Sequence, residues 1–477
     1  MKVLFITPGN IASPIQEIEL EIMQEHIDAG DEIFVLVCHG ELPSCWINPG
    51  HSKLQCMYCK SRLHNGYKLL SKNIHVLPLI DIHPDQQNKI DQFKVDADTN
   101  EDLKKIYVED FDLGWALLST KITNTRNPYP DLKDCKEELN RWAKTSLMIY
   151  YSVKNHIQHH TYDLAYVYNG RSKDTRPILR VLQHAGQKLN TYNTGGVYHS
   201  YGIFPDTFIH DREKTEQQII KLWKSEPDEI KKIKIASEFY ENRFKGKFSV
   251  GPNFVQGMAG NQLPENFDPH KKNISIFISS EDENFAIGDY WNYEFYRDQL
   301  DGLNQLSKSM DLFPVDEYDF YLRVHPNLKS VSNPYSDLLK NYTHPRIKLI
   351  PADSAVNTYE LIRYSDKVIC FGSTVAAEAT YLEKPSIECG KSFFMNLGSN
   401  YIPKNHQELL QLILENKLPP KPKLGILMYS YWWLQYGQKP KYLKFVTDTQ
   451  LTFKGKTLQS SWWLETLKKI KNRNKNI

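Results

Sequence analysis

Residues 2–37 read KVLFITPGNIASPIQEIELEIMQEHIDAGDEIFVLV. The apolar, β-prone run at residues 2–6 predicts a buried strand, which the following Pro-Gly-Asn ends. A serine and a proline then open a segment whose apolar side chains recur at three- and four-residue steps, which predicts a helix that stops at Gly30. A second apolar run at residues 32–37 predicts another strand. Strand, glycine loop, helix and strand in this order indicate a parallel α/β sheet with its functional edge at the strand C-termini.

The second half of the chain repeats this pattern. Strand-like runs at residues 274–278, 320–324 and 367–371 each end in a short polar or small-residue turn. A loop-like stretch just before them places a domain boundary near residue 262. We therefore expect an α/β fold of two Rossmann-like domains facing a central cleft. The predicted domains are residues 1–262, with a polar insertion at about 85–130, and residues 263–420, followed by C-terminal helices and a basic tail over 421–477.

Composition excludes several classes of protein. The 477 residues carry 59 Lys and Arg against 57 Asp and Glu, so no global electrostatic field selects nucleic acid or a membrane as the partner. No run of about 18 apolar residues occurs, and the N-terminus enters a strand-like segment without a cationic region. These features predict a cytoplasmic globular protein that does not bind nucleic acid.

Polar residues follow three predicted strands of the second half, and the C-terminal ends of parallel strands meet at one edge of a sheet. Hydroxyl groups and backbone amides there could hold a phosphate, histidine and arginine could add positive charge, and a glutamate one helical turn on could bind ribose hydroxyls. The predicted nucleotide-site residues are Ser279, Ser280, Arg323, His325, Pro326, Gly372, Ser373, Thr374 and Glu378.

Each of these residues also has a structural interpretation. His325 and Pro326 could form only the turn after a strand. Ser279 and Ser280 could cap a helix whose first turn is acidic. Glu378 could be a surface charge, although the alanines around it indicate a close-packed helix where a carboxylate needs a partner.

The order of RVHP (323–326), a TYEL-containing helix (358–361) and FGSTVAAEATYLEKPSI (371–387) resembles the donor-binding domain of GT-B glycosyltransferases that build bacterial capsules and lipopolysaccharides. The resemblance is to the sialyltransferases and Kdo transferases, which use CMP-activated acidic sugars. It covers about residues 274–395 well and the first half only by architecture. Many relatives have two serines where this chain has Ser373 and Thr374.

The resemblance implies that His325, Ser373 and Thr374 contact the phosphate of a nucleotide-sugar donor, and that no divalent metal is needed for that step. We therefore expect transfer of a sugar, such as Kdo or sialic acid from its CMP derivative, to a surface polysaccharide or lipopolysaccharide acceptor. Two alternatives stay open: a nucleotide-sugar 2-epimerase on the same scaffold, and a metal-binding scaffold protein with a vestigial cleft.

A transferase of this kind needs a base to deprotonate the acceptor hydroxyl, and that base must come from the first domain. Glu17 and Glu19 lie on the helix after the first glycine loop, and Asp174 follows the turn Asn169-Gly170-Arg171. All three carboxylates are candidates, and sequence alone does not choose among them.

Four of the seven cysteines lie close together, at Cys38, Cys45, Cys56 and Cys59. The terminal C-x-x-C has the spacing of metal ligands, because two thiolates across a tight turn can share one ion. Structural zinc is the predicted occupant, with an iron–sulfur cluster as the second choice. The alternative is four unliganded thiols.

The last residues, from about Ser460, combine tryptophans with a run of lysines and an arginine. Such a segment could contact the anionic surface of the inner membrane, where lipid-linked glycan acceptors reside. It could equally be a helix that packs its tryptophan face on the protein and ends in a frayed basic tail.

Overall fold

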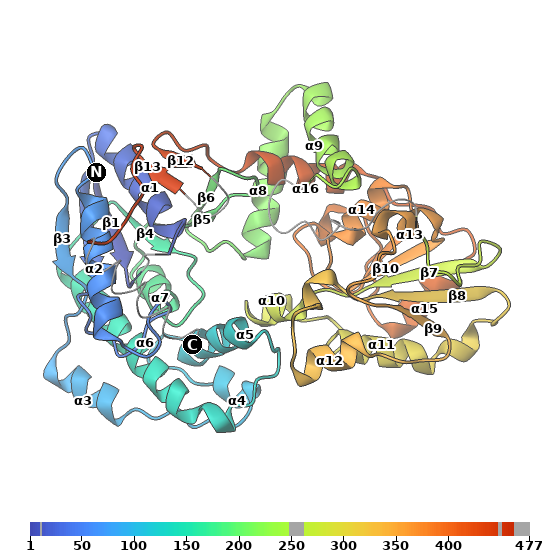
Figure 1. The fold of residues 1–477 in the computed structure, drawn as a ribbon, viewed down its shortest axis with the longest axis horizontal. Coiled ribbons are helices and arrows are strands. Elements are labelled where there is room, and N and C mark those ends of the chain that lie inside the picture. The colour runs from blue at the N-terminus through green and yellow to red at the C-terminus, as the bar shows by residue number, and fades with distance from the viewer. Residues whose placement is uncertain (10–11, 248–261, 447–450, 462–477) are drawn as a thin grey trace. The chain divides into compact units, whose positions relative to one another are not determined.

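The computed structural model describes residues 1–9, 12–247, 262–446 and 451–461 (Figure 1). The chain forms two compact units. The first unit consists of Met1–Lys121, Pro130–Asp211 and Tyr436–Ile477, and the second of Ile122–Tyr129 and Arg212–Gln435. The chain therefore passes between the units after residues 121, 129, 211 and 435.

The first unit contains a six-stranded sheet in the order β3-β2-β1-β4-β5-β6. All neighbouring strands are parallel except β5 and β6, which are antiparallel. Leu4 in the central strand pairs with Phe34 on one side and Ala165 on the other. The strands are β1 (Lys2–Thr7), β2 (Glu32–Val37), β3 (His75–Pro78), β4 (Leu164–Tyr168), β5 (Leu189–Thr194) and β6 (Tyr201–Pro205).

The predicted first helix is present as α1 (Ile15–Asp28), and its end has a clear local cause. Gly30 adopts a φ of +87°, a left-handed conformation that favours glycine. Its N–H donates to Ile27 O at 3.0 Å, and the Asp31 N–H donates to His26 O at 2.9 Å. These two bonds satisfy the last carbonyls of the helix and turn the chain into β2.

Six further helices belong wholly or partly to the first unit. A short C-terminal hairpin, formed by β12 (Leu443–Phe445) and β13 (Leu451–Phe453), contacts α1. Glu21 on α1 accepts hydrogen bonds from the backbone N–H groups of Lys441, Tyr442 and Leu443, which anchors this hairpin. The helices are α2 (Lys53–Tyr67), α3 (Pro84–Gln92), α4 (Asn100–Lys104), α5 (Leu113–Thr125), α6 (Lys136–His159) and α7 (Arg176–His184), with a 3-10 turn η1 (Lys133–Cys135).

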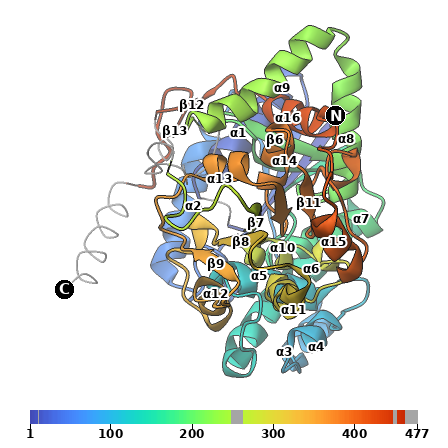
Figure 2. The same ribbon diagram turned by 90° about the vertical axis from the view of Figure 1, so that its right-hand side faces the viewer.

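The second unit contains a five-stranded, wholly parallel sheet in the order β11-β10-β7-β8-β9. All six residues of β8 are buried, as expected for a parallel strand covered on both faces. Helices α13 and α14 lie on one face of this sheet, and α11 and α12 lie on the other (Figure 1, Figure 2). The strands are β7 (Lys272–Phe277), β8 (Tyr318–Arg323), β9 (Ile347–Ile350), β10 (Lys367–Cys370) and β11 (Ser386–Glu388).

The helices of the second unit are mostly short crossover segments between these strands, which parallel pairing requires. They are α8 (Arg212–Ser225), α9 (Glu229–Phe244), α10 (Glu281–Phe285), α11 (Gln299–Lys308), α12 (Pro334–Lys340), α13 (Thr358–Tyr364), α14 (Val375–Tyr381), α15 (His406–Leu414) and α16 (Leu424–Gln435), with 3-10 turns η2 (Asp289–Trp291), η3 (Met310–Leu312), η4 (Pro326–Leu328) and η5 (Met395–Leu397). Two Rossmann-like units of this kind confirm the predicted α/β class.

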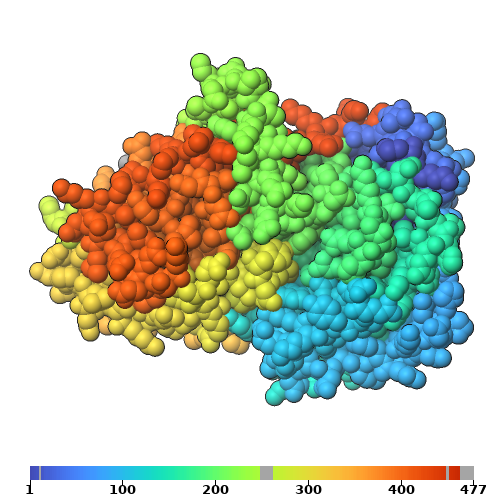
Figure 3. All heavy atoms as spheres, turned by 180° about the vertical axis from the view of Figure 1, so that it is seen from behind, coloured from blue at the N-terminus to red at the C-terminus, as the bar shows by residue number. Residues whose placement is uncertain are grey.

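The boundary between the units differs from the predicted one near residue 262. Helices α8 and α9 pack on α16 through Trp223, Ala236 and Tyr431, so they join the second unit. Tyr240 on α9 also donates a hydrogen bond to Ile426 O at 2.7 Å. In the space-filling view, the light green surface of α8 and α9 adjoins the orange surface of the second unit (Figure 3).

The predicted C-terminal segment 421–477 and insertion 85–130 are each divided between the units. Helix α16 belongs to the second unit, whereas the chain from Tyr436 onward returns to the first. Residues Ile122–Tyr129, at the end of the insertion, belong to the second unit. Periodicity identified these helices but could not assign them to a sheet, because that assignment depends on long-range packing.

Candidate functional site

The sheet of the second unit reverses its strand order between β7 and β10. From β7 the chain runs to β8 and β9 on one side, and it then returns to β10 and β11 on the other. Ligands of parallel α/β sheets bind at the C-terminal edge near such a reversal, because the loops after the two strands diverge there. Ser279 and Ser280 follow β7, and the turn 372–374 follows β10.

The three predicted residue groups share this edge. Strand β7 is paired in parallel with β10 on one side and with β8 on the other. Adjacent strands lie about 4.8 Å apart, so the ends of β10 and β8 are separated by about 10 Å. This separation is comparable to the length of a sugar phosphate. The hydroxyls after β7 and β10 and the imidazole after β8 could therefore contact one such ligand.

The turn after β10 brings two backbone segments close together. Gly372 has a φ of +73°, and a Cβ on Gly390 would lie 2.3 Å from the Gly372 amide nitrogen. Both positions therefore need glycine, one for its conformation and the other for space. Ser373 Oγ accepts a hydrogen bond from the Val375 N–H at 3.3 Å and is largely buried, whereas Thr374 is half-buried.

Glu378 has a partner that the sequence did not reveal. Its carboxylate accepts a hydrogen bond from Arg243 Nη1 at 2.8 Å and is 3% exposed. Thr374 Oγ1 approaches the same oxygen at 3.5 Å. Arg243 comes from the end of α9, far away in the sequence. The predicted need for a partner is therefore met by an ion pair, and the predicted ribose contact would have to compete with it.

His325 lies at the end of β8 and is a neutral hydrogen-bond donor, not a cation. Desolvation, together with the charges of Arg323 and Arg126, lowers its pKa to about 4. Nδ1 accepts a hydrogen bond from the Asn327 N–H at 3.1 Å, so the ring hydrogen of the neutral form sits on Nε2. Pro326 begins the 3-10 turn η4 that supplies this Asn327 N–H. The structure therefore corrects the prediction that His325 supplies positive charge, because the imidazole is neutral near pH 7.

Arg323, which was predicted to offer positive charge to a phosphate, instead binds backbone carbonyls of the protein. Its side chain is 2% exposed, and its guanidinium donates to the backbone carbonyls of Pro351 and, at 3.3 Å, Ser354. Burial lowers its pKa to about 10, which still leaves it charged near neutral pH. These bonds hold the loop after β9, so the guanidinium is engaged by the protein itself.

Ser279 and Ser280 do not act as helix caps. The Ser279 N–H donates to Gln299 Oε1 at 3.0 Å, and the buried Ser279 Oγ has no hydrogen-bond partner among the described residues. Ser280 occupies the N-cap position of α10, but its hydroxyl makes no capping bond. Ser280 Oγ instead donates to Asp282 Oδ1 at 2.7 Å.

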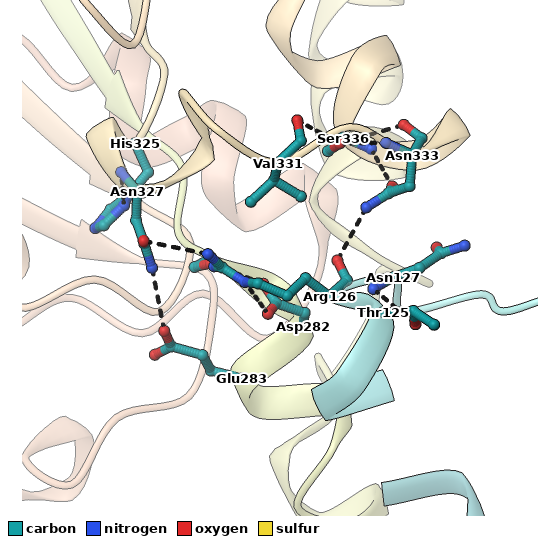
Figure 4. A network of polar contacts seen from close by, with 11 residues as sticks. Thr125, Arg126, Asn127, Asp282, Glu283, His325, Asn327, Val331, Asn333 and Ser336 are labelled. Carbon is teal, nitrogen blue, oxygen red and sulfur yellow. Dashed lines mark hydrogen bonds and ion pairs between the residues drawn. The ribbon is translucent and has the colours of Figure 1, made fainter. Parts of the chain in front are cut away.

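Arg126 joins this network from a remote part of the chain (Figure 4). Its Nη2 donates to Ser280 Oγ at 2.6 Å, its Nε to Asp282 Oδ2 at 3.0 Å, and its Nη1 to Asn327 Oδ1 at 3.3 Å. Arg126 therefore links the loop after β7 to the loop after β8. No sequence pattern indicated this role, because Arg126 lies in the weakly patterned insertion.

Glu281, next to Ser280, is a fully buried carboxyl group. Burial raises its pKa to about 8, against hydrogen bonds that favour the ionised form. The Gln299 N–H donates to one oxygen at 2.9 Å, and Tyr335 contacts the other. Glu281 is therefore largely protonated near neutral pH and holds α11 and α12 at the end of β7.

The first unit has its own strand-order reversal, between β1 and β4, and Glu19 lies beside it. The Glu19 carboxylate accepts hydrogen bonds from Thr7 Oγ1 at 2.9 Å and from the Tyr192 hydroxyl at 2.5 Å. Burial raises its pKa to about 7, even though both hydrogen bonds favour the ionised form. Glu19 therefore has a pKa suited to proton transfer, but the carboxyl group is 1% exposed.

The other two predicted base candidates are held by ion pairs. Glu17 pairs with Arg62 at 2.6 Å, and burial raises its pKa although Arg62 opposes the shift. Asp174 pairs with Lys173 at 2.6 Å and accepts the Trp46 N–H at 2.9 Å. Both carboxylates are buried, and both stabilise the loops around them.

The four clustered cysteines lie on the loop after β2 and on α2, and all are free thiols. Cys56 and Cys59 both lie within α2, so their spacing does not bridge the tight turn that a metal site was predicted to use. In the described part of the chain, no three His, Cys, Asp or Glu side chains are arranged to hold a metal ion. Burial raises the pKa of Cys45 to about 12 and also raises those of Cys38 and Cys59. Cys38, Cys45 and Cys56 are nevertheless near enough to Cys59 for their charges to raise its pKa further. Structural zinc, an iron–sulfur cluster and four unliganded thiols all stay predictions.

The predicted membrane contact cannot be placed on the fold, because residues 462–477 of the basic tail lie outside the described residues. Within the ranges that the structure describes, no helix is both long enough and apolar enough to cross a bilayer.

No family model and no curated protein matches this chain. Solved structures do show similarity. The Thermosulfurimonas dismutans KpsC, beta Kdo 2,4 transferase, is 14% identical, with 64% of this chain and 87% of that chain covered and a TM-score of 0.37. The S. aureus MnaA–UDP co-structure is 13% identical, with 92% of both chains covered and a TM-score of 0.24.

The Methanocaldococcus jannaschii UDP-GlcNAc 2-epimerase in complex with UDP-GlcNAc and UDP is 11% identical, with 90% of this chain and 98% of that chain covered and a TM-score of 0.25. TM-scores in this range reflect only partial overlap of two backbones.

Proposed function

We propose that this protein is a glycosyltransferase that binds a nucleotide-sugar donor at the C-terminal edge of the second sheet. The observation that supports this most is the convergence of Ser279–Ser280, His325 and Gly372–Thr374 on one edge, beside the strand-order reversal. A phosphate can be bound by hydroxyl groups, by the N–H of a neutral imidazole, and by a glycine turn whose backbone lets the ligand come close. The resemblance of residues 274–395 to donor-binding domains adds the preference for a CMP-activated acidic sugar, such as Kdo or sialic acid.

The chemistry follows from where charge develops. When the bond between sugar and phosphate breaks, negative charge accumulates on the phosphate oxygens. The Nε2–H of His325 and the hydroxyls of Ser373 and Thr374 would stabilise that charge from a site already organised by the fold. A neutral imidazole binds the leaving phosphate by one directed hydrogen bond, and it need not lose a proton before the next cycle.

The acceptor would bind to the first unit, and its hydroxyl needs a base. Glu19 has a pKa raised to about 7 and accepts its hydrogen bonds from two hydroxyl groups. Glu17 and Asp174 are instead held in ion pairs, which favours Glu19 as the base. In this proposal the proton would leave the acceptor through a hydroxyl that Glu19 contacts, either Thr7 or Tyr192. The glycan or lipid-linked acceptor belongs to the proposal on the strength of the resemblance.

The test has two steps. A thermal-shift screen against CMP, UDP, GDP and their sugars identifies the donor, because a ligand that binds only the folded state raises the melting temperature. His325→Ala is then expected to lose transfer by 100-fold or more while keeping its fold, in line with about 3 kcal/mol for a donor to a developing oxyanion.

The chain offers a matched control in His344→Ala. His344 also precedes a proline, and its Nδ1 likewise accepts a backbone N–H two residues on, from Arg346 at 3.2 Å. It comes just before β9, however, and so lies at the opposite edge of the sheet. The His344 variant should transfer normally. Normal transfer by His325→Ala would refute the assignment, and release of an epimerised sugar from donor alone would favour the 2-epimerase alternative.

A further inference from the structure

The phosphate site needs a positive charge, and the basic residues expected at this edge do not provide one freely. Arg323 is buried against the carbonyls of Pro351 and Ser354. His325 is neutral near pH 7. Lys391, in the loop after β11, forms an ion pair with Glu294. A phosphate anion bound only by neutral donors would lack the charge-assisted hydrogen bonds that bind phosphate strongly.

Arg126 is the basic residue that the fold adds to this edge. Its guanidinium lies between the loops after β7 and β8 and hydrogen-bonds Ser280, Asp282 and Asn327 (Figure 4). The side chain is 31% exposed, whereas Asp282 is 7% exposed. Arg126 is also close enough to His325 for its charge to lower the imidazole pKa.

The guanidinium retains binding capacity. It has five N–H groups, and its bonds to the three residues above use four of them, one being a long 3.5 Å contact from Nη2 to Asp282 Oδ1. The second N–H of Nη1 has no partner within the described residues. This nitrogen is on the Asn327 side of the fork, and Asp282 binds the opposite side through Nε and Nη2.

The backbone that carries Arg126 is anchored independently of its side chain. The Arg126 carbonyl accepts a hydrogen bond from Asn333 Nδ2 at 3.0 Å, at the start of α12. Three residues on, the Tyr129 hydroxyl donates to the buried Asp298 at 2.7 Å, and its ring packs edge-on against Tyr335. Residues 122–129 thus dock on the second unit, although first-unit segments flank them on both sides. Substituting the guanidinium should leave this docking intact.

We propose that Arg126 supplies the positive charge that binds the phosphate of the nucleotide, through the free N–H of Nη1. This inference rests on the proposed function, because it names a further residue of the same site. Asp282 and Ser280 orient the guanidinium, and Asn327 lies where the phosphate would approach.

The experiment compares a nucleotide with its own nucleoside. Calorimetric titration with CMP and with cytidine, or with the UDP or GDP pair if the screen selects one of those, separates phosphate binding from base and ribose binding. Arg126→Gln is expected to weaken CMP by roughly 10- to 100-fold and to leave cytidine unchanged, since a charge-assisted bond to phosphate is lost. Arg126→Lys keeps the charge without the fork and should recover most of the CMP affinity.

Arg297→Gln is the matched control. Arg297 belongs to the same unit, pairs with Asp298 at 2.9 Å and is 72% exposed, so CMP should bind this variant normally. Normal CMP affinity of Arg126→Gln would overturn the inference alone. Equal loss of CMP and cytidine, or no recovery in Arg126→Lys, would show that the residue only orders the loops. Wild-type protein that binds no nucleotide at all would instead refute the proposed function, and this inference with it.

Discussion

Glu19 offers a prediction whose sign and size follow from its surroundings. The carboxyl is 1% exposed between β1 and β5, and burial raises its pKa from 4.5 to about 7. A raised carboxyl pKa means that the folded state holds its proton more tightly than the unfolded state. The stability that Glu19 contributes is therefore fully present below pH 4.5 and is lost as the pH rises toward 7. Ionised Glu19 should cost the fold about 3 kcal/mol at pH 8.

Glu19→Gln removes this titration while keeping the shape of the side chain. We expect the free energy of unfolding of the variant, relative to wild type, to rise by about 1 kcal/mol per pH unit above pH 5 and to level off near pH 8. Urea unfolding at pH 5, 6, 7 and 8 measures the difference at each pH. The test is the slope of the stability difference against pH. Any stability lost because the amide hydrogen-bonds Thr7 and Tyr192 imperfectly would shift the differences at all four pH values by the same amount.

Glu101→Gln serves as the control, because Glu101 is a first-unit carboxylate that is 72% exposed and pairs with Lys104. Its stability difference from wild type should be small at every pH. A difference between Glu19→Gln and wild type that stays constant from pH 5 to 8 would refute the reasoning, since it would place the pKa of Glu19 at its ordinary value. Transfer assays on the same variant test the proposed base, which should lose turnover but retain donor binding.

Three further predictions concern the second unit and the thiols. Glu378→Gln should destabilise the fold by about 3 kcal/mol, because the largely buried Arg243 would lose its carboxylate partner. A double-mutant cycle with Arg243→Gln should show strong coupling, and additive losses would contradict the ion pair. Gly390→Ala should lower the melting temperature by several degrees, because its Cβ would meet the Gly372 nitrogen, and an unchanged melting curve would show that these loops separate easily. Chelators should leave the melting temperature unchanged, since no three His, Cys, Asp or Glu side chains among the described residues are arranged to hold a metal ion. A fall in the melting temperature on chelation would instead support the zinc prediction.

The sequence predicted the sheet-forming segments well, because each is specified locally. The strand at residues 32–37 and the helix stop at Gly30 appear as predicted, since apolar runs and a left-handed glycine act within a few residues. The strands predicted at 274–278, 320–324 and 367–371 appear within two residues of those limits. Parallel pairing then brought their C-terminal residues to one edge, as the order of strands and helices had indicated.

The dipeptide His-Pro illustrates the limit of a motif. It occurs three times, at His83, His325 and His344, and only His325 follows a parallel strand at the edge near the reversal. The motif set was thus informative through its order along the chain and the strands that precede it. The motif does not predict the charge state of His325, because desolvation and the charges of Arg323 and Arg126 determine it.

What the sequence determined by itself is the alternation of strands and helices, the α/β class and the residues that end each strand, because short-range patterns carry that information. Only the tertiary structure decided which long-range partners those residues meet. Arg126 reaches Asp282 across 156 positions, and Arg243 reaches Glu378 across 135. The tertiary structure also placed α8 and α9 with the second unit and Cys56 with Cys59 on one helix. The physical reason is the same in each case: burial and ion pairing depend on distances in space, which no local pattern encodes.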